Sequence, residues 1–190
     1  MENGEWPRYI GNELKGKIVG LMGFGAIARL VAKKLQNFDV TVLAFDLFPN
    51  LEVAEELGVT ITSKEEVIAK SDIVSIHIPA TSDTYHMFND ATFAAMKKGA
   101  FLVNPARGAL VDLDALARAI MNGQIAGAAL DAFELEPLPK NTSILQCENI
   151  VLTPHTGAET EESYYNVSMT TARDIIRVIK GEQPKHCINY

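Results

Sequence analysis

The sequence predicts an α/β protein built on a doubly wound parallel sheet, and three observations support this. Short apolar runs alternate with helical segments along the chain, and short turns join them. A glycine-rich turn stands between the first apolar run and the first helix. Polar residues interrupt the apolar pattern mainly where the strands end. With 190 residues, the chain is long enough to form one domain with a substantial core.

Each expected strand is a short apolar run that stops at a glycine, a proline or a polar residue. The run at 71–78 is almost continuously apolar, as expected for a parallel strand that is covered on both faces. The expected strands cover residues 17–22, 40–45, 59–61, 71–78, 100–104, 125–130 and 149–153.

The expected helices are marked by the residues at their ends. Ser63 and Asp112 stand at N-cap positions, and Glu66 lies where a capping box has its glutamate. Glycines that can stop a helix follow four of them: Gly58, Gly99, Gly123 and Gly181. The expected helices cover residues 26–36, 51–57, 64–70, 90–96, 113–121 and 159–180. Residues 1–16 show no strand pattern and are expected to form an arm or part of a helix.

The turn from Gly23 to Ala28 has the glycine spacing of a dinucleotide-binding fingerprint, with alanine at the third position. Gly23 and Gly25 stand where a Cβ would collide with the turn or with a ligand. The helix that begins at Ala26 points its unpaired N–H groups and its positive dipole end at the same place, which suits a pyrophosphate. Taken alone, this pattern is equally compatible with a plain strand–helix turn.

An acidic residue on the next strand narrows the interpretation. Asp46 follows the strand at 40–45, about 20 residues past the glycines, where the adenosine ribose of a dinucleotide would lie. A carboxylate there accepts hydrogen bonds from two ribose hydroxyls and repels a 2′-phosphate. Leu47 and Phe48 come next, rather than an arginine, so the sequence favours NAD over NADP. The alternative is that Asp46 caps a helix or lies in a loop.

The composition argues against several classes of function. Lys and Arg number 17 against 24 Asp and Glu, and there is no basic run, so nucleic acid and anionic membranes are not expected as partners. No apolar stretch approaches the length of a membrane span, and the first five residues do not resemble a signal peptide. Cys147 and Cys187 have neither metal-ligand nor redox spacing. We therefore expect a cytoplasmic protein without a metal site.

The C-terminal ends of parallel strands share one edge of the sheet, where ligands bind in such folds. The pattern places the following at that edge: the glycine turn, Asp46, His77, residues 104–108, Asp131 and His155.

Arg107, Glu136 and His155 could form an acid–base site. Arginine offers a rigid fork of donors for a carboxylate, and histidine gives and takes a proton near neutral pH. A carboxylate beside the histidine would raise the pKa of its imidazolium. Spacing and charge do not decide between this site and three separate structural roles. Arg107 could pair with Asp112 or cap a helix end, Glu136 could be solvated in its acidic loop, and His155 could bond to the backbone.

Six segments, in order, resemble the signature motifs of the D-isomer-specific 2-hydroxyacid dehydrogenases. This family includes phosphoglycerate, glycerate, D-lactate and formate dehydrogenases. The resemblance extends from about Trp6 to Asn189. The matching segments are residues 13–17, 23–28, 77–81, 104–112, 129–137 and 153–157. Ala28, Pro105 and the pair Ala158-Glu159 depart from the usual pattern, and each could alter cofactor affinity.

The resemblance implies a hydride transfer between the nicotinamide C4 of NAD and C2 of a small 2-hydroxy or 2-keto acid. Arg107 would bind the carboxylate and the 2-oxygen of the substrate. His155 would be the general acid–base on that oxygen, and Glu136 would pair with His155 and keep it protonated for reduction.

The resemblance also implies the cofactor contacts. Asp131 would hold the carboxamide side of the nicotinamide, Ala26 and Ile27 would meet the pyrophosphate, and Asp46 would meet the ribose. The other residues expected to line the cofactor site are Gly23, Gly25, His77, Pro79, Thr84, Pro105, Ala106, Arg107, His155 and Gly157.

The family is built of two domains, so we expect residues 1–190 to be a single NAD-binding domain without its substrate domain. Residues 1–11 and 183–190 would be stubs of the crossovers to that domain. A cleft with one wall cannot exclude water or clamp a small acid, so activity should be absent or very weak while NAD binding survives. Family members usually dimerise through this domain, so a homodimer is possible. The alternative is a non-catalytic, NAD-sensing scaffold of the same fold, like the related corepressors.

Overall fold

A computed structural model describes residues 10–187 of the chain, and they divide into two compact units at the Pro154–His155 bond. Most of the arm predicted at the N-terminus, and the last three residues of the predicted C-terminal stub, lie outside the described residues. The part of the arm at 10–16 contains a turn but neither a helix nor a strand.

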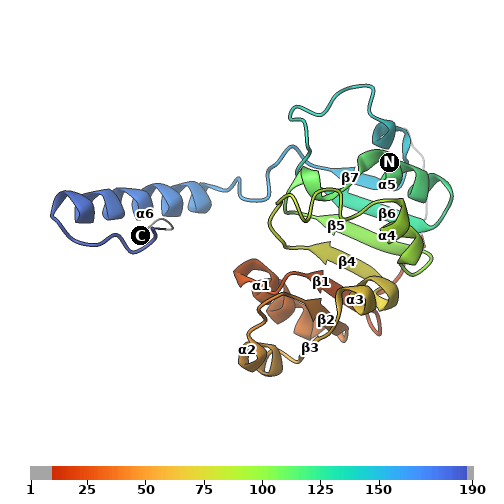
Figure 1. Cartoon of the computed structure of the whole chain (residues 1–190), viewed down its shortest axis with the longest axis horizontal. Helices are drawn as coiled ribbons and strands as arrows, with labels where there is room; N and C mark the ends of the chain where they lie inside the picture. The colour runs from red at the N-terminus through yellow and green to blue at the C-terminus, as the bar shows by residue number, and fades with distance from the viewer. Residues whose placement is uncertain (1–9, 188–190) are drawn as a thin grey trace, which may run out of the picture. The chain divides into compact units, whose positions relative to one another are not determined.

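The first unit is organised around a parallel sheet that has seven strands among the described residues (Figure 1). The strands are β1 (Ile18–Met22), β2 (Thr41–Phe45), β3 (Val59–Ile61), β4 (Ile73–Ile76), β5 (Ala100–Asn104), β6 (Ile125–Leu130) and β7 (Ile150–Leu152). Their order is β3-β2-β1-β4-β5-β6-β7, so the direction of winding reverses between β1 and β4. This confirms the doubly wound sheet that the sequence predicts.

The helices of the first unit also agree with the sequence pattern, and the ends of all predicted elements shift by two residues at most. The α-helices are α1 (Ala26–Leu35), α2 (Leu51–Glu56), α3 (Lys64–Lys70), α4 (Asp90–Ala95) and α5 (Leu113–Met121). The sequence did not indicate the short 3-10 helices η1 (Gln36–Phe38), η2 (Gly108–Leu110) and η3 (Ser143–Gln146). Runs of this length show no periodicity.

The predicted cap of α3 is confirmed, but the predicted capping box is not. Ser63 Oγ accepts from the backbone N–H of Glu66 at 3.2 Å. The Glu66 carboxylate, however, bonds to the Thr62 hydroxyl and the Lys70 ammonium. These bonds hold the pKa of Glu66 below its usual range, the Lys70 bond most of all. The Glu66 carboxylate therefore bonds to the neighbouring Lys70 ammonium and not to the backbone N–H at the helix terminus.

The two faces of the sheet bury separate cores. On one face, α3, α4 and α5 pack over a core that reaches from Met22 through Val74 and Leu102 to Leu130. On the other face, α1 and α2 pack over a smaller core that includes Leu21 and Ala44. The second core ends where β1 meets β4.

The half of this second face formed by β5, β6 and β7 is exposed. Leu21, Ser75, Val103, Ala129 and Val151 form one row across the sheet. Along this row the side chains change from fully buried at Leu21 to 62% exposed at Val151. No helix of the described first unit contributes to a core there.

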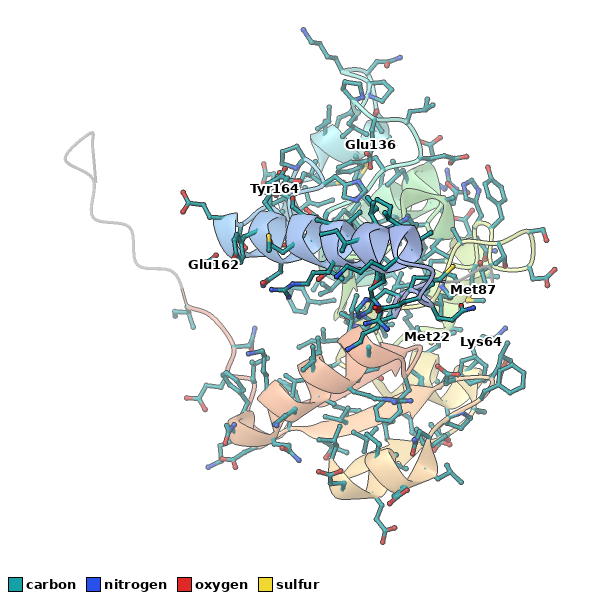
Figure 2. All side chains as sticks on the ribbon, turned by 90° about the vertical axis from the view of Figure 1, so that its left-hand side faces the viewer. Met22, Lys64, Met87, Glu136, Glu162 and Tyr164 are labelled. Carbon is teal, nitrogen blue, oxygen red and sulfur yellow. The ribbon has the colours of Figure 1, made fainter. Side chains whose placement is uncertain are left out.

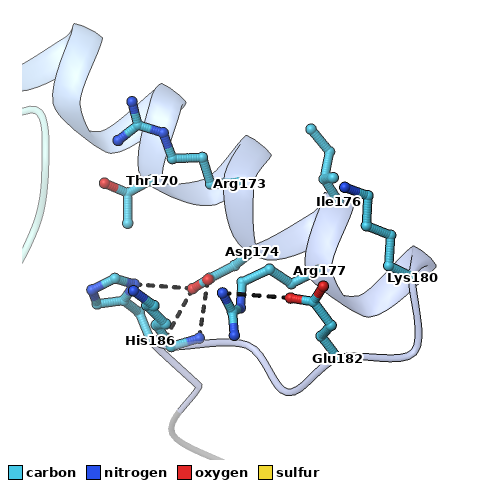
Figure 3. Close-up of a pocket in the computed structure, with 9 residues that line it drawn as sticks. Thr170, Arg173, Asp174, Ile176, Arg177, Lys180, Glu182 and His186 are labelled. Atoms are coloured by element: carbon cyan, nitrogen blue, oxygen red, sulfur yellow. Dashed lines mark hydrogen bonds and ion pairs between the residues drawn. The ribbon is translucent and has the colours of Figure 1, made fainter.

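The second unit consists mainly of α6 (Glu161–Ile179), whose first turn includes Glu162 and Tyr164 (Figure 2). Within this helix, the Asp174 carboxylate accepts from the backbone N–H groups of Lys185 and His186, which follow the helix, at 3.0 and 2.9 Å (Figure 3). The Lys185 N–H, above all, lowers the pKa of Asp174. A cavity of about 420 Å³ lies between α6 and the segment at 182–186 that follows it. Within residues 10–187, no helix combines the length and the apolar character that crossing a membrane requires.

Candidate cofactor and active site

The glycine turn lies where the strand order reverses, between the ends of β1 and β4. Gly23 has φ +99°, and a Cβ added to it would be 2.7 Å from the carbonyl oxygen of His77. Gly25 is different, because its φ is −75° and nothing lies within 4 Å of an added Cβ. The protein itself therefore requires glycine at position 23, whereas at position 25 it leaves open space.

The N-terminus of α1 faces this turn without a side-chain cap. Its N-cap is Gly25, so no side chain accepts from the first N–H groups of the helix. In every other α-helix of residues 10–187 the N-cap side chain accepts a backbone N–H. An uncapped helix end beside open space is the arrangement that suits a pyrophosphate.

Asp46, directly after β2, does more than the sequence suggested. Its Oδ2 accepts from the Phe24 N–H at 2.7 Å, inside the glycine turn, and its Oδ1 accepts from the Phe48 N–H at 2.9 Å. A carboxylate has about four acceptor sites, so Asp46 braces the turn and keeps the capacity for two further hydroxyl donors.

A cavity of about 760 Å³ opens beside Asp46, at the ends of β2, β3 and β4. Lys64 and Met87, labelled in Figure 2, contribute to its lining together with the predicted residues Pro79 and Thr84. Thr84 Oγ1 donates to the Pro79 carbonyl at 2.9 Å and thereby closes the loop that forms one wall. The volume is that of a typical small-molecule site.

The turn after β5 carries Pro105, Ala106 and Arg107, and the buried side chain of Asn104 shapes it. Asn104 Oδ1 accepts from the Ala106 N–H at 3.1 Å, and Nδ2 donates to the Arg107 carbonyl at 2.9 Å. The exposed Arg107 side chain donates from Nη1 to the Ala106 carbonyl at 2.7 Å. Most of its five N–H donors therefore remain for a ligand.

The loop after β6 packs directly on this turn. A Cβ added to Gly108 would be 2.0 Å from the backbone carbon of Phe133, so the two backbones are in contact. The Phe133 N–H donates to Glu136 Oε1 at 2.9 Å. The structure therefore brings together the loops that carry Arg107 and Glu136. Asp131, at the start of the second loop, accepts from Thr153 Oγ1 at 2.6 Å.

The remaining predicted residues occupy other places. The ring of His77 bonds through Nε2 to Ser75 Oγ at 2.9 Å, on the α1 side of the sheet, and burial lowers the pKa of His77. His155 and Gly157 belong to the second unit, and His155 has φ +56°. The other two members of the proposed acid–base trio, Arg107 and Glu136, belong to the first unit. Within residues 10–187, no cluster of His, Cys, Asp and Glu could hold a metal ion.

The family model described as the D-isomer specific 2-hydroxyacid dehydrogenase, NAD binding domain, matches residues 1–157. The chain belongs to this family.

Named relatives support the assignment. The chain is 42% identical over its whole length to the glyoxylate reductase of Thermofilum pendens and 38% identical to the D-3-phosphoglycerate dehydrogenase of Archaeoglobus fulgidus. It spans 58% of the first relative and 36% of the second. The solved structure of the D-lactate dehydrogenase of Lactobacillus jensenii with NAD+ matches all of this chain with a TM-score of 0.88 at 30% identity, and the match covers 61% of that protein.

The geometry at the glycine turn fits NAD, which the description of the family model names. The open space at Gly25 and the uncapped α1 can receive a diphosphate, and Asp46 retains acceptors for ribose hydroxyls. The sequence placed Asn104 at this edge of the sheet but did not predict that its side chain shapes the turn after β5. Thr153 was not predicted as a site residue, although a polar side chain directly after an apolar strand could have indicated it.

Replacing Gly25 by alanine is expected to weaken NADH binding at least about tenfold, because the methyl group fills the space in front of α1. The free energy of unfolding should fall by no more than about 1 kcal/mol, the cost of a poorer N-cap. Fluorescence titration with NADH and urea unfolding provide the two measurements.

Gly23→Ala is the matched variant. It should lower the free energy of unfolding as well as the affinity for NADH, because its Cβ meets the His77 carbonyl and its φ is positive. Unchanged NADH affinity in Gly25→Ala would show that no ligand approaches the turn.

Proposed function

We propose that this chain serves as the NAD-binding domain of an enzyme that transfers hydride between NAD(H) and a D-2-hydroxy or 2-keto acid. The observation that carries the proposal is the open glycine turn, which lies where the strand order reverses. The uncapped N-terminus of α1 and the Asp46 carboxylate lie beside it. The relatives named above are oxidoreductases, and they give no support to the alternative of a non-catalytic scaffold.

In this proposal the cofactor crosses the C-terminal edge of the sheet. The N–H groups of Ala26 and Ile27 meet its diphosphate, and Asp46 accepts from the adenosine ribose. Asp131, oriented by Thr153, accepts from the nicotinamide carboxamide. The other proposed contacts come from the strand ends, from the loops that follow them and from one residue of the second unit. In the first unit they are Gly23, Gly25, His77, Pro79, Thr84, Pro105 and Ala106, and in the second unit Gly157. Bound NAD supplies the hydride chemistry.

The chain's own residues would then orient the substrate and move one proton. The Arg107 guanidinium binds the substrate carboxylate and draws electron density from the 2-oxygen. His155 donates a proton to that oxygen during reduction and removes it during oxidation. Glu136 pairs with His155 and favours its charged form.

A substrate-binding domain would complete this site. The resemblance implies that residues 1–11 and 183–190 lead to it, and the chain's 58% share of the glyoxylate reductase is consistent with this. Without such a domain, water would reach the nicotinamide and turnover would be very weak.

Asp46→Ala is expected to weaken NAD binding and to reduce the preference for NAD over NADP at least about tenfold. Loosening of the glycine turn would weaken the binding of both cofactors equally. The ratio of their two dissociation constants therefore reports only the effect of removing the Asp46 charge. Titrations with NADH and NADPH give that ratio. An unaltered ratio would remove Asp46 from the ribose site.

Catalysis can be tested in a chimaera in which this chain replaces the matching 58% of the Thermofilum pendens glyoxylate reductase. The chimaera should oxidise NADH with glyoxylate, and Arg107→Ala or His155→Ala should lower kcat/KM at least about a hundredfold. Glu55→Gln, a change on the exposed surface of α2, is the control. Full activity in both site variants would exclude them from the chemistry.

We also propose that the domain forms a homodimer in the cytoplasm. The exposed half of the sheet supports self-association, because Phe101 and Val151 are 42% and 62% exposed there. Cys147 and Cys187 are both free thiols, which is usual in a reducing compartment. Sedimentation should give a dimer for the chain and a monomer for Val151→Asp. A monomeric parent chain would contradict the dimer.

A further inference from the structure

A second polar cluster joins the loop after β4 to the loop after β6. Tyr85 Oη donates to Glu134 Oε1 at 2.9 Å, and His86 Nε2 bonds to Glu134 Oε2 at 3.1 Å. The rings of Tyr85 and His86 stack with their centroids 3.9 Å apart. Both oxygens of one carboxylate are therefore held by adjacent side chains of the other loop.

The charges in this cluster reinforce its hydrogen bonds. The bond from His86, followed by that from Tyr85, holds the pKa of Glu134 below its usual range, so Glu134 is ionised at neutral pH. The same bond to Glu134 raises the pKa of Tyr85, with a smaller contribution from Asp112. The carboxylate thus accepts from a phenol that stays protonated.

The cluster lies between two parts of the proposed NAD site. On one side, the loop that carries Tyr85 and His86 also carries Pro79 and Thr84, which line the cavity beside Asp46. On the other side, Glu134 stands between Asp131 and Glu136 in the chain. The backbone N–H of His86 also donates to the Ala109 carbonyl at 2.8 Å, so the turn after β5 is tied to the same point.

The backbone of His86 lies in the left-handed region, with φ +46°. Most residues other than glycine adopt this region rarely, although asparagine, aspartate and histidine do so more often than the rest. The bonds to Ala109 and Glu134 hold it there.

We propose that Glu134 is a positioning residue that couples cofactor binding in the cavity beside Asp46 to the order of the loop carrying Asp131 and Glu136. NADH in the cavity fixes the loop at 79–88, and the bonds of Tyr85 and His86 to Glu134 transmit that order to the loop at 131–138. This inference rests on the proposed function. Because the cluster is largely exposed, its hydrogen bonds add little to the free energy of unfolding of the whole domain. Their removal is expected to reduce the order of the loop at 131–138 instead.

Amide hydrogen exchange of the chain with and without NADH tests the coupling. In the parent chain, NADH should slow exchange at 23–29, 79–88 and 131–138. In Glu134→Ala, the slowing at 23–29 and 79–88 should persist, while that at 131–138 falls at least about fivefold.

Two further variants separate coupling from general damage. Glu134→Gln should restore most of the slowing at 131–138, since an amide offers an oxygen to Tyr85 and an N–H to the ring of His86. His86→Asn should behave like Glu134→Ala, because asparagine tolerates a positive φ but lacks the imidazole. Glu55→Gln is the matched surface control and should resemble the parent chain.

The outcomes distinguish the two proposals. No slowing at 23–29 in the parent chain would contradict NAD binding at the glycine turn itself. Slowing at 23–29 combined with an unchanged response at 131–138 in Glu134→Ala would overturn the coupling alone. An equal loss in Glu134→Gln and Glu134→Ala would also overturn it, because the retained hydrogen bonds would then have no effect.

Discussion

At the reversal between β1 and β4, the backbone of Gly23 lies against the carbonyl of His77, and a single methyl group would separate the two strand ends. This close approach allows the chain to leave β1, turn at once and begin α1. It therefore directs the free N–H groups of α1 to the place where the sheet changes its direction of winding. In the proposed site, the position of the diphosphate depends on this contact.

Asp46 illustrates how one side chain can serve both structure and recognition. Its hydrogen bond to Phe24 lies within the turn, so the residue that would read the ribose also holds the residues that would grip the diphosphate. The two halves of the proposed dinucleotide site are therefore linked by a hydrogen bond of the protein itself. A carboxylate has enough acceptor capacity for both tasks, whereas a neutral residue of similar size has not.

The sequence predicted the features that depend on neighbours in the chain. The strands, the helix caps at Ser63 and Asp112, and Asp46 at the end of its strand all follow from local pattern. The cluster of Tyr85, His86 and Glu134 did not, because its partners are about fifty residues apart and meet through loops without periodicity. The predicted capping box at Glu66 was wrong because Lys70, four residues later, offers a better partner than a backbone N–H.

The role of His155 also required more than pattern, since it opens a unit of its own. The motif that contains His155 implies its role, but no local pattern of polar and apolar residues does.

The lengths of the outer strands have a consequence for how copies of this protein can meet. β3 and β7, at the two edges of the sheet, have three residues each. An edge this short presents few unpaired backbone groups and is a poor template for a strand from another molecule. Lateral growth into fibrils is thereby discouraged, even though apolar side chains on β5 and β7 are accessible to solvent.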